Sequence, residues 1–77
     1  MQYEINITTE QLYDGIIELY DSCFYNKIND FIININILEN VNILHLKDFL
    51  ELSEALIKEF NINIDFNFTG KIDIFND

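Results

Sequence analysis

Carboxylates are the side chains in this sequence whose type and spacing could do chemistry, and they recur on two segments that we predict to be helical. Residues four apart lie on one face of a helix, roughly 5–6 Å apart at Cβ, where like charges destabilise the helix. The residues concerned are Glu10, Asp14, Glu18 and Asp21 in the segment 9–24, and Asp48, Glu51 and Glu54 in the segment 46–61. Such a surface is either simply solvated or available for a cationic partner.

Tyr13 lies beside the first row of carboxylates and off the apolar stripe of its helix. Tyrosine is enriched among the residues that dominate protein–protein binding energy. A tyrosine among carboxylates therefore favours a basic protein as the partner. Tyr25 and Phe24 are further candidates for exposed aromatic residues, and the alternative for all three is partial burial at the rim of the core.

Metal binding and catalysis are less well supported by the residues present. Cys23 and His45 are the only soft metal ligands, whereas structural zinc needs four ligands at recognisable spacing. The acidic stretch 65–77 lacks the spacing of a calcium loop. We expect Cys23 in the core and His45 at a helix entry, with no metal, no other cofactor and no enzymatic activity.

The charge balance indicates the kind of partner. The chain has 14 acidic and four basic residues, a formal net charge of −10 at pH 7, and no arginine. Such a protein repels nucleic acid and anionic membranes and is attracted to basic surfaces in a salt-dependent way. We therefore expect a basic protein as partner, no direct binding of nucleic acid or membrane, and a monomer or homodimer.

The compartment is predicted from cysteine use and from the hydropathy pattern. A single cysteine fits a reducing environment. The first residues lack the basic start and apolar run of a signal peptide, and no apolar run approaches the roughly 18 residues of a membrane span. These features predict a cytoplasmic protein.

Hydrophobic periodicity predicts a single α+β domain over residues 1–77. Alternating apolar residues indicate strands, and apolar residues at helical spacing indicate two helices. The expected buried stripes are Leu12, Ile16, Leu19, Tyr20 and Cys23 in the first helix and Phe49, Leu50, Ser53, Leu56, Ile57 and Phe60 in the second. We expect the order β-α-β-β-α-β-β, with strands at 2–7, 31–38, 41–43, 62–68 and 72–74 and helices at 9–24 and 46–61. The expected sheet is antiparallel or mixed, with four to five strands and both helices on one face, so that its other face carries mainly Asn, Glu and Asp.

Local signals place the ends of these elements. Thr8 and Gln11 have the spacing of a capping box at the start of the first helix. Turns are expected at residues 39–40 and 69–70, each joining two antiparallel strands. Gly15, inside the first helix, costs about 1 kcal/mol relative to Ala in helix stability. Close packing against another element would be a reason for a glycine at this position.

The size, the acidity and the seven helical carboxylates together resemble a class of mobile-element inhibitors that mimic DNA, the anti-CRISPR and anti-restriction proteins. The resemblance covers charge and size and involves no sequence motif. It implies a protein that blocks a nuclease by occupying its nucleic-acid-binding channel, using Tyr13 and the seven carboxylates. Two alternatives remain: an immunity or antitoxin protein that caps a basic toxin, and a homo-oligomeric structural protein that uses exposed strand edges.

Overall fold

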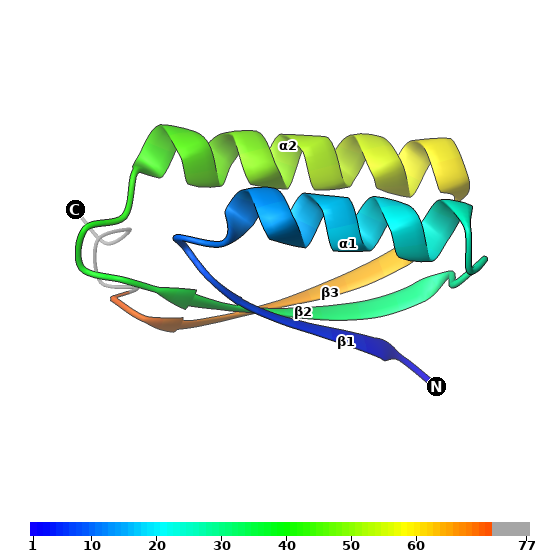
Figure 1. The fold of residues 1–77 in the computed structure, drawn as a ribbon, viewed down its shortest axis with the longest axis horizontal. Coiled ribbons are helices and arrows are strands. Elements are labelled where there is room, and N and C mark those ends of the chain that lie inside the picture. Colours follow the sequence, from blue (N-terminus) through cyan, green and yellow to red (C-terminus); the bar gives the residue numbers. More distant parts are fainter. Residues whose placement is uncertain (72–77) are drawn as a thin grey trace.

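Strands and helices alternate along the chain in the computed structural model, which describes residues 1–71 (Figure 1). Within these residues there are three strands, β1 (Tyr3–Thr8), β2 (Asp30–Ile37) and β3 (Asn63–Gly70). Two helices connect them, α1 (Leu12–Phe24) and α2 (Ile43–Phe60). Residues 72–77 lie outside the described part.

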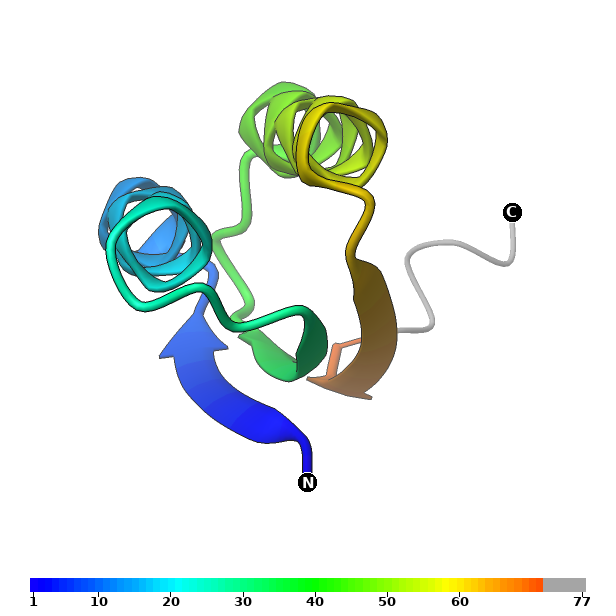
Figure 2. The ribbon, with the colours of Figure 1, turned by 90° about the vertical axis from the view of Figure 1, so that its right-hand side faces the viewer.

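The three strands form one parallel sheet in the order β1-β2-β3. In its register Ile5 pairs with Ile33, and Ile33 with Phe66. Parallel neighbours need a long crossover connection, and α1 and α2 supply the two crossovers. Right-handed crossovers in a sheet of sequential strand order bring both helices to the same face, as Figures 1 and 2 show.

The predicted sheet is therefore wrong in strand number and direction. The two helices and the α+β class are present, but the described residues form a three-stranded, all-parallel sheet instead of a mixed or antiparallel one with four to five strands. The predicted order β-α-β-β-α-β-β is replaced by β-α-β-α-β. The differences arise at residues 41–43 and at residues 69–70.

The expected strand at 41–43 is absent because Asn42 starts a helix. Its side-chain Oδ1 accepts hydrogen bonds from the backbone N–H groups of Leu44 (3.0 Å) and His45 (3.2 Å). These are donors that a helix otherwise leaves unpaired at its start. Helix α2 consequently begins at Ile43, three residues before the predicted start, and the turn at residues 39–40 leads into a helix.

The expected hairpin turn at residues 69–70 is also wrong. Thr69 and Gly70 continue β3 and pair with Asn36 and Ile37 of β2. Gly70 has a φ of +86°, and a Cβ there would overlap the backbone carbonyl oxygen of Ile37. Glycine is thus required at this position by the backbone path. The predicted strand at 72–74 lies outside the described residues.

The predicted capping-box residues of the first helix do interact, but in a turn before it. The Gln11 side-chain oxygen accepts from the Thr8 backbone N–H (2.9 Å), and the Thr8 hydroxyl accepts from the Glu10 N–H (3.2 Å). A capping box would instead place the hydroxyl on the N–H three residues on. Helix α1 starts at Leu12 as a result, three residues after the predicted start.

The core lies between the sheet and the helices. The predicted apolar stripes face the core: Leu12, Leu19 and Cys23 of α1 and Phe49 and Ser53 of α2 are buried. The partly buried members that pack against this core are Ile16, Leu50, Leu56, Ile57 and Phe60. Their counterparts on the sheet alternate along the strands. These are Ile5, Ile7, Phe31, Ile33, Ile35 and Ile37, all buried. Tyr20, predicted to be in the stripe, is instead 42% exposed, and its ring packs edge-on against Phe60 of α2 with centroids 5.9 Å apart.

Gly15 allows α1 to approach both the sheet and α2 closely. A Cβ on this residue would lie 2.8 Å from Ile7 Cδ1 of β1 and 3.3 Å from Phe49 Cε1 of α2. The first distance is shorter than carbon atoms tolerate. Close packing therefore explains a glycine that the helix alone disfavours.

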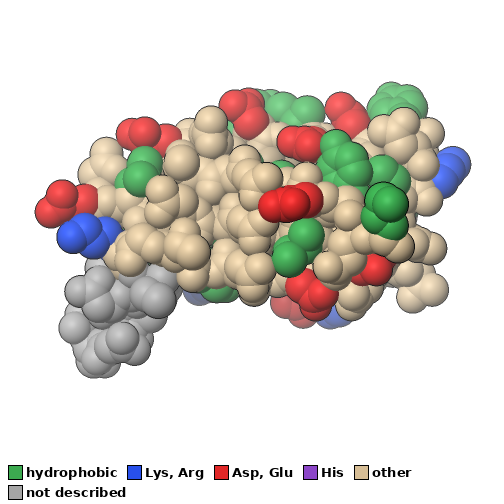
Figure 3. All heavy atoms as spheres, turned by 90° about the horizontal axis from the view of Figure 1, so that it is seen from below, with side chains coloured by type: hydrophobic (Ala, Val, Ile, Leu, Met, Phe, Trp, Pro, Cys, Tyr) green, Lys and Arg blue, Asp and Glu red, His purple; other side chains and the backbone are tan. Residues whose placement is uncertain are grey.

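The face of the sheet away from the helices carries a ladder of side-chain amides, as the alternation predicted. Asn34 Nδ2 donates to Asn6 Oδ1 (2.7 Å) and to Glu4 Oε2 (2.9 Å), and Asn67 Nδ2 donates to Asn34 Oδ1 (2.9 Å). Figure 3 shows this side, where tan polar side chains and backbone predominate and red carboxylates lie between them. We call it the open face.

Candidate protein-binding site

The eight residues predicted to bind a partner are all exposed, but they do not form one surface. They are Glu10, Tyr13, Asp14, Glu18, Asp21, Asp48, Glu51 and Glu54. Glu10 precedes α1 in a turn, the next four lie on α1, and the last three lie on α2. Their surroundings separate them into a group along the junction of the helices and a group away from it.

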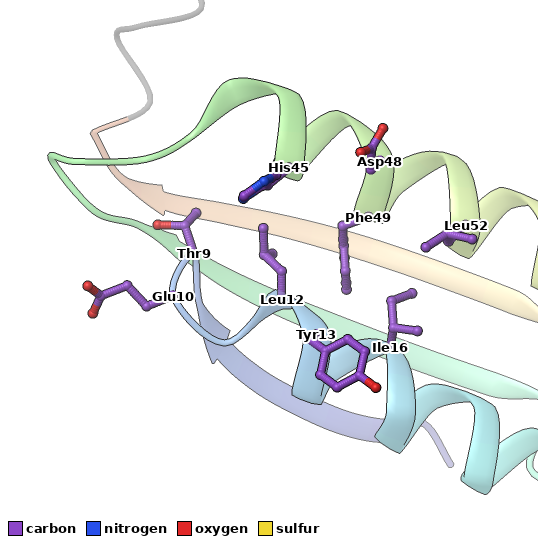
Figure 4. A pocket seen from close by; sticks show the side chains of 9 residues that line it. All are labelled: Thr9, Glu10, Leu12, Tyr13, Ile16, His45, Asp48, Phe49 and Leu52. Carbon is purple, nitrogen blue, oxygen red and sulfur yellow. The ribbon is translucent and has the colours of Figure 1, made fainter.

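The first group borders a groove between α1 and α2. Near the start of both helices, Glu10, Tyr13 and Asp48 line a cavity of about 350 Å³ together with apolar side chains. Figure 4 shows Leu12 and Phe49 pointing into the space between the helices, while the carboxylates of Glu10 and Asp48 point outward. Carboxylates here lie at the rim of an apolar surface.

The groove continues toward the other end of the helices. A second cavity of about 390 Å³ is lined by Asp21 and by apolar side chains of both helices, and it shares Ile16 and Leu52 with the first. Glu51 lies beside Asp48 and Leu52 on the α2 side. We call the two joined cavities the interhelical groove. Its lining residues are Thr9, Glu10, Leu12, Tyr13, Ile16, Ile17, Tyr20, Asp21, His45, Asp48, Phe49, Leu52, Ala55 and Leu56.

The second group is engaged elsewhere or lies outside the groove. Glu18 is turned toward the sheet, where its Oε2 accepts a hydrogen bond of 2.8 Å from the Tyr3 hydroxyl. Glu54 is 3.4 Å from Lys58 in an exposed ion pair one helical turn away. Asp14 is exposed but does not line the groove. The four-residue spacing in the sequence suggested one continuous row of binding carboxylates, and the structure does not form such a row.

Several apolar residues of the groove were missed in the sequence. Leu52 is 53% exposed and Ile17 is 41% exposed, and each lies beside the apolar stripe of its helix. The sequence does contain a signal for them, since on each helix one apolar residue adjoins the buried stripe and widens it. Whether those residues face each other depends on how the helices pack, which periodicity does not specify.

The three aromatic residues for which both exposure and partial burial were considered are exposed. Tyr13 and Tyr25 are 78% and 69% exposed, and Phe24 is 44% exposed. Phe24 packs edge-on against Tyr25 and face-on against Tyr20, with ring centroids 4.9 Å and 5.6 Å apart, beyond the end of the groove. Tyr13 lines the first cavity of the groove with Glu10 and Asp48, and Tyr20, 42% exposed, lines the second with Asp21.

Two titratable groups are perturbed by their surroundings. The hydrogen bond from Tyr3 to Glu18 raises the pKa of the tyrosine above its ordinary value, because the neighbouring carboxylate favours the protonated hydroxyl. Burial raises the pKa of the Cys23 thiol, because the thiolate loses its hydration. Both groups are therefore held in their neutral forms.

Cys23 and His45 lie apart in the fold. Cys23 is buried on the sheet side of α1, whereas His45 is exposed in the first turn of α2 at one end of the groove. Among residues 1–71, no three His, Cys, Asp or Glu side chains are grouped as metal ligands. Neither α1 nor α2, the helices of this described part, has the length and hydropathy to cross a membrane.

Fold and surface together define a small parallel sheet with two helices on one side, between which runs an apolar groove with a carboxylate rim. No family model, curated protein or solved structure matches the chain.

Proposed function

We propose that this chain is a small acidic inhibitor that binds a basic, nucleic-acid-binding surface of a nuclease or effector complex and blocks that surface by occupying it. The observation that carries the proposal is the unneutralised charge of the helical side. Asp14, Asp21, Asp48 and Glu51 are all exposed, while the one ion pair within residues 1–71 joins Glu54 to Lys58. Excess charge of one sign destabilises a folded chain by self-repulsion, which a cationic partner relieves.

Helix α2 holds two exposed carboxylates, Asp48 and Glu51, three residues apart on one side of the helix. Neighbouring carboxylates one turn apart are separated by roughly 6 Å, the same order as the spacing of phosphates along a nucleic-acid strand. Lysine and arginine clusters that hold phosphates also bind carboxylates. A nuclease channel built for nucleic acid therefore offers charges of the right sign and spacing for this protein.

Inhibition of this kind is stoichiometric and requires no chemistry from the inhibitor, in keeping with our expectation of no catalysis and no cofactor. Electrostatic steering would speed association with the basic surface, and added salt would slow association and weaken the complex. The nuclease it blocks would act in the cytoplasm, where the buried thiol of Cys23 stays reduced.

The first test is capture of the partner from a lysate of the source organism, elution with a salt gradient, and a nuclease assay of what elutes. We expect a basic nuclease or nucleic-acid-binding complex that is released at moderate salt. Its nuclease activity should be fully inhibited once one molar equivalent of the chain has been added. Nucleic acid should compete for the same surface. A captured protein that binds nucleic acid and the chain simultaneously would overturn occlusion.

Charge reversal tests the electrostatic mechanism. Asp48→Lys combined with Glu51→Lys reverses two exposed carboxylates beside the groove and should abolish inhibition. Reversing Glu18 is less informative, because this residue also bonds Tyr3. The matched control is Glu39→Lys with Glu59→Lys, which changes the net charge equally at two exposed positions away from the groove. Inhibition that survives the first pair would contradict the mechanism.

A homo-oligomeric structural protein is the second candidate, favoured by the sheet edges. Within residues 1–71, β1 and β3 each pair on one side only, and β3 carries the stacked rings of Phe66 and Phe68, with centroids 6.3 Å apart. Exposed edges are templates for pairing with another chain. Sedimentation separates the two candidates, since the inhibitor is expected to remain monomeric. An antitoxin role is recognised in the capture experiment if the eluted protein is a toxin encoded beside this chain.

A further inference from the structure

The interhelical groove exposes more apolar surface than a solvated helix pair needs. Tyr13, Ile17, Tyr20 and Leu52 are each at least 41% exposed, and all four line the same groove. Scattered exposed hydrophobic residues are ordinary on protein surfaces, whereas contiguous ones indicate a binding site. Charge alone would not require these side chains, since an electrostatic mimic could carry polar residues there.

The charges around the groove have one sign. Glu10 and Asp48 line its first half, Asp21 lines its second half, and Glu51 lies beside it on α2. None of the four lysines lines either cavity. His45, at one end, is the remaining titratable side chain besides Tyr13 and Tyr20. A ligand that fits this site is apolar along its middle and positively charged along its flanks.

We infer that the interhelical groove binds an amphipathic basic helix of the partner, with the apolar side of that helix packed between α1 and α2 and its lysines and arginines against the carboxylates at the rim. The inference rests on the proposed function for the basic character of the partner. It adds that one segment of the partner provides the main contact and that apolar packing contributes to affinity. Amphipathic helices in hydrophobic grooves are a recurrent form of protein recognition.

The dimensions of the groove agree with a helix of a few turns. The lining residues of α2 run from His45 to Leu56, which corresponds to about 17 Å along the helix. A segment of similar length would contact Tyr13 near one end and Tyr20 near the other. Its apolar residues at positions i, i+3, i+4 and i+7 would face Leu52 and Ile17.

A second copy of the chain is a poorer occupant. Each copy has a formal net charge of −10, and pairing two grooves would place the acidic rims of both copies, which include Asp48 and Glu51, in one interface. Like charges brought together in this way oppose association. Charge complementarity therefore favours a basic partner over self-association through this surface.

The test uses two synthetic peptides of 18 residues with the same composition of leucine and lysine. In one, leucines recur at helical spacing to form an apolar face; in the other, they are distributed around the helix. Binding to the full chain is measured by fluorescence anisotropy at physiological salt, at peptide concentrations where each peptide is monomeric. We expect the amphipathic peptide to bind at least about tenfold more tightly, because only its leucines can enter the groove together.

Variants of the protein locate the binding site. Tyr13→Ala combined with Leu52→Ala should weaken binding of the amphipathic peptide by about tenfold or more, as loss of a hot spot does. Both side chains are exposed, so folding should be preserved, which circular dichroism checks. The matched control is Tyr25→Ala, an exposed tyrosine outside the groove, whose removal should leave binding unchanged.

The outcomes separate this inference from the proposed function. Equal binding of the two peptides, or no loss in the Tyr13→Ala, Leu52→Ala variant, would overturn the groove as a helix-binding site. If the captured nuclease were still inhibited by that variant, inhibition by charge would stand without the groove. Selective binding of the amphipathic peptide, together with no inhibition of any nuclease, would support the groove and contradict the proposed function. A dimer that the variant converts to monomers would assign the groove to a second copy and overturn the inference.

Discussion

The two faces of the sheet are built from the same three strands but are completed in different ways. On one face, side chains such as Ile33 and Ile35 are fully buried beneath α1 and α2. On the other, Asn6, Asn34 and Asn67 bond to one another across the strands. Parallel sheets are usually covered on both faces. Side-chain hydrogen bonds between neighbouring strands thus take the place of a second covering layer on this face.

This difference separates the stability of the molecule from its candidate binding surface. Burial of apolar side chains on the covered face supplies the main driving force for folding. The helices that cover that face then present the interhelical groove on their outer side. Substitutions on the open face should therefore affect stability and partner binding less than substitutions on the covered face. The free energy of unfolding of variants on each face measures the difference in stability.

Ile33→Ala, on the covered face of β2, should have the largest effect. Ile33 is fully buried, so the substitution removes apolar contacts and leaves a cavity, which typically lowers the free energy of unfolding by about 2–5 kcal/mol. Urea denaturation followed by circular dichroism measures the change. If the variant does not fold, Ile33→Val should lower the same quantity by about 0.5–1.5 kcal/mol. A loss for Ile33→Ala smaller than that for Asn34→Ala would contradict the expected order of the two faces.

Asn34→Ala, the next residue on the same strand, should have an intermediate effect. Asn34 makes three side-chain hydrogen bonds, to Glu4, Asn6 and Asn67, and it is half-buried. Because each such bond contributes roughly 0.5–1.5 kcal/mol at most and water can replace part of it, we expect a loss of about 1–2 kcal/mol in the same urea experiment. The control is Asn36→Ala, an exposed asparagine on the same face, which should change stability by less than about 0.5 kcal/mol.

The smallest of the expected effects is that of alkaline pH on stability, which should grow as the pH rises above neutrality. Tyr3 and Cys23 have pKa values raised in the folded state, so folding favours their protonated forms. The stability they contribute is fully present below the pKa values of the unfolded chain and is lost as pH rises through the folded ones. We expect the urea midpoint to fall from about pH 9 upward.

The variant Tyr3→Phe, Cys23→Ala isolates these two groups from the other groups that titrate in alkali. Its urea midpoint should fall less steeply with pH than that of the unmodified chain, whatever its stability at pH 7. Identical slopes for the two proteins would show that neither group is linked to folding.

Much of the secondary structure could be predicted from the sequence, because the apolar period of each element is clear. The alternation in residues 31–37 identified β2 and its two faces, and the stripe through Leu12 and Leu19 identified α1. Strand direction could not be predicted from the same pattern. One-sided alternation is typical of antiparallel sheets with one solvated face, and the amide ladder gives parallel strands the same appearance.

The remaining errors come from single side chains and from packing. Asn42 was read as part of a strand although asparagine is a favoured N-cap, and that one hydrogen-bonding side chain decides between strand and helix at residues 41–43. For the candidate site, the carboxylates could be identified by residue type. The groove between them could not, because it depends on how closely α1 and α2 pack, and Gly15 contributes to that distance.

The sequential order of the strands has a consequence for how the chain folds. Pairing Tyr3 with Phe31 closes a loop of 28 residues, and pairing Phe31 with Ile64 closes one of 33. The entropic costs of closing these loops differ by only about 0.1 kcal/mol. The cost of loop closure therefore does not favour either strand pair, β1 with β2 or β2 with β3, to form first. Strand β2 takes part in both pairs. Folding is expected to begin from either end of the chain and to converge on this central strand.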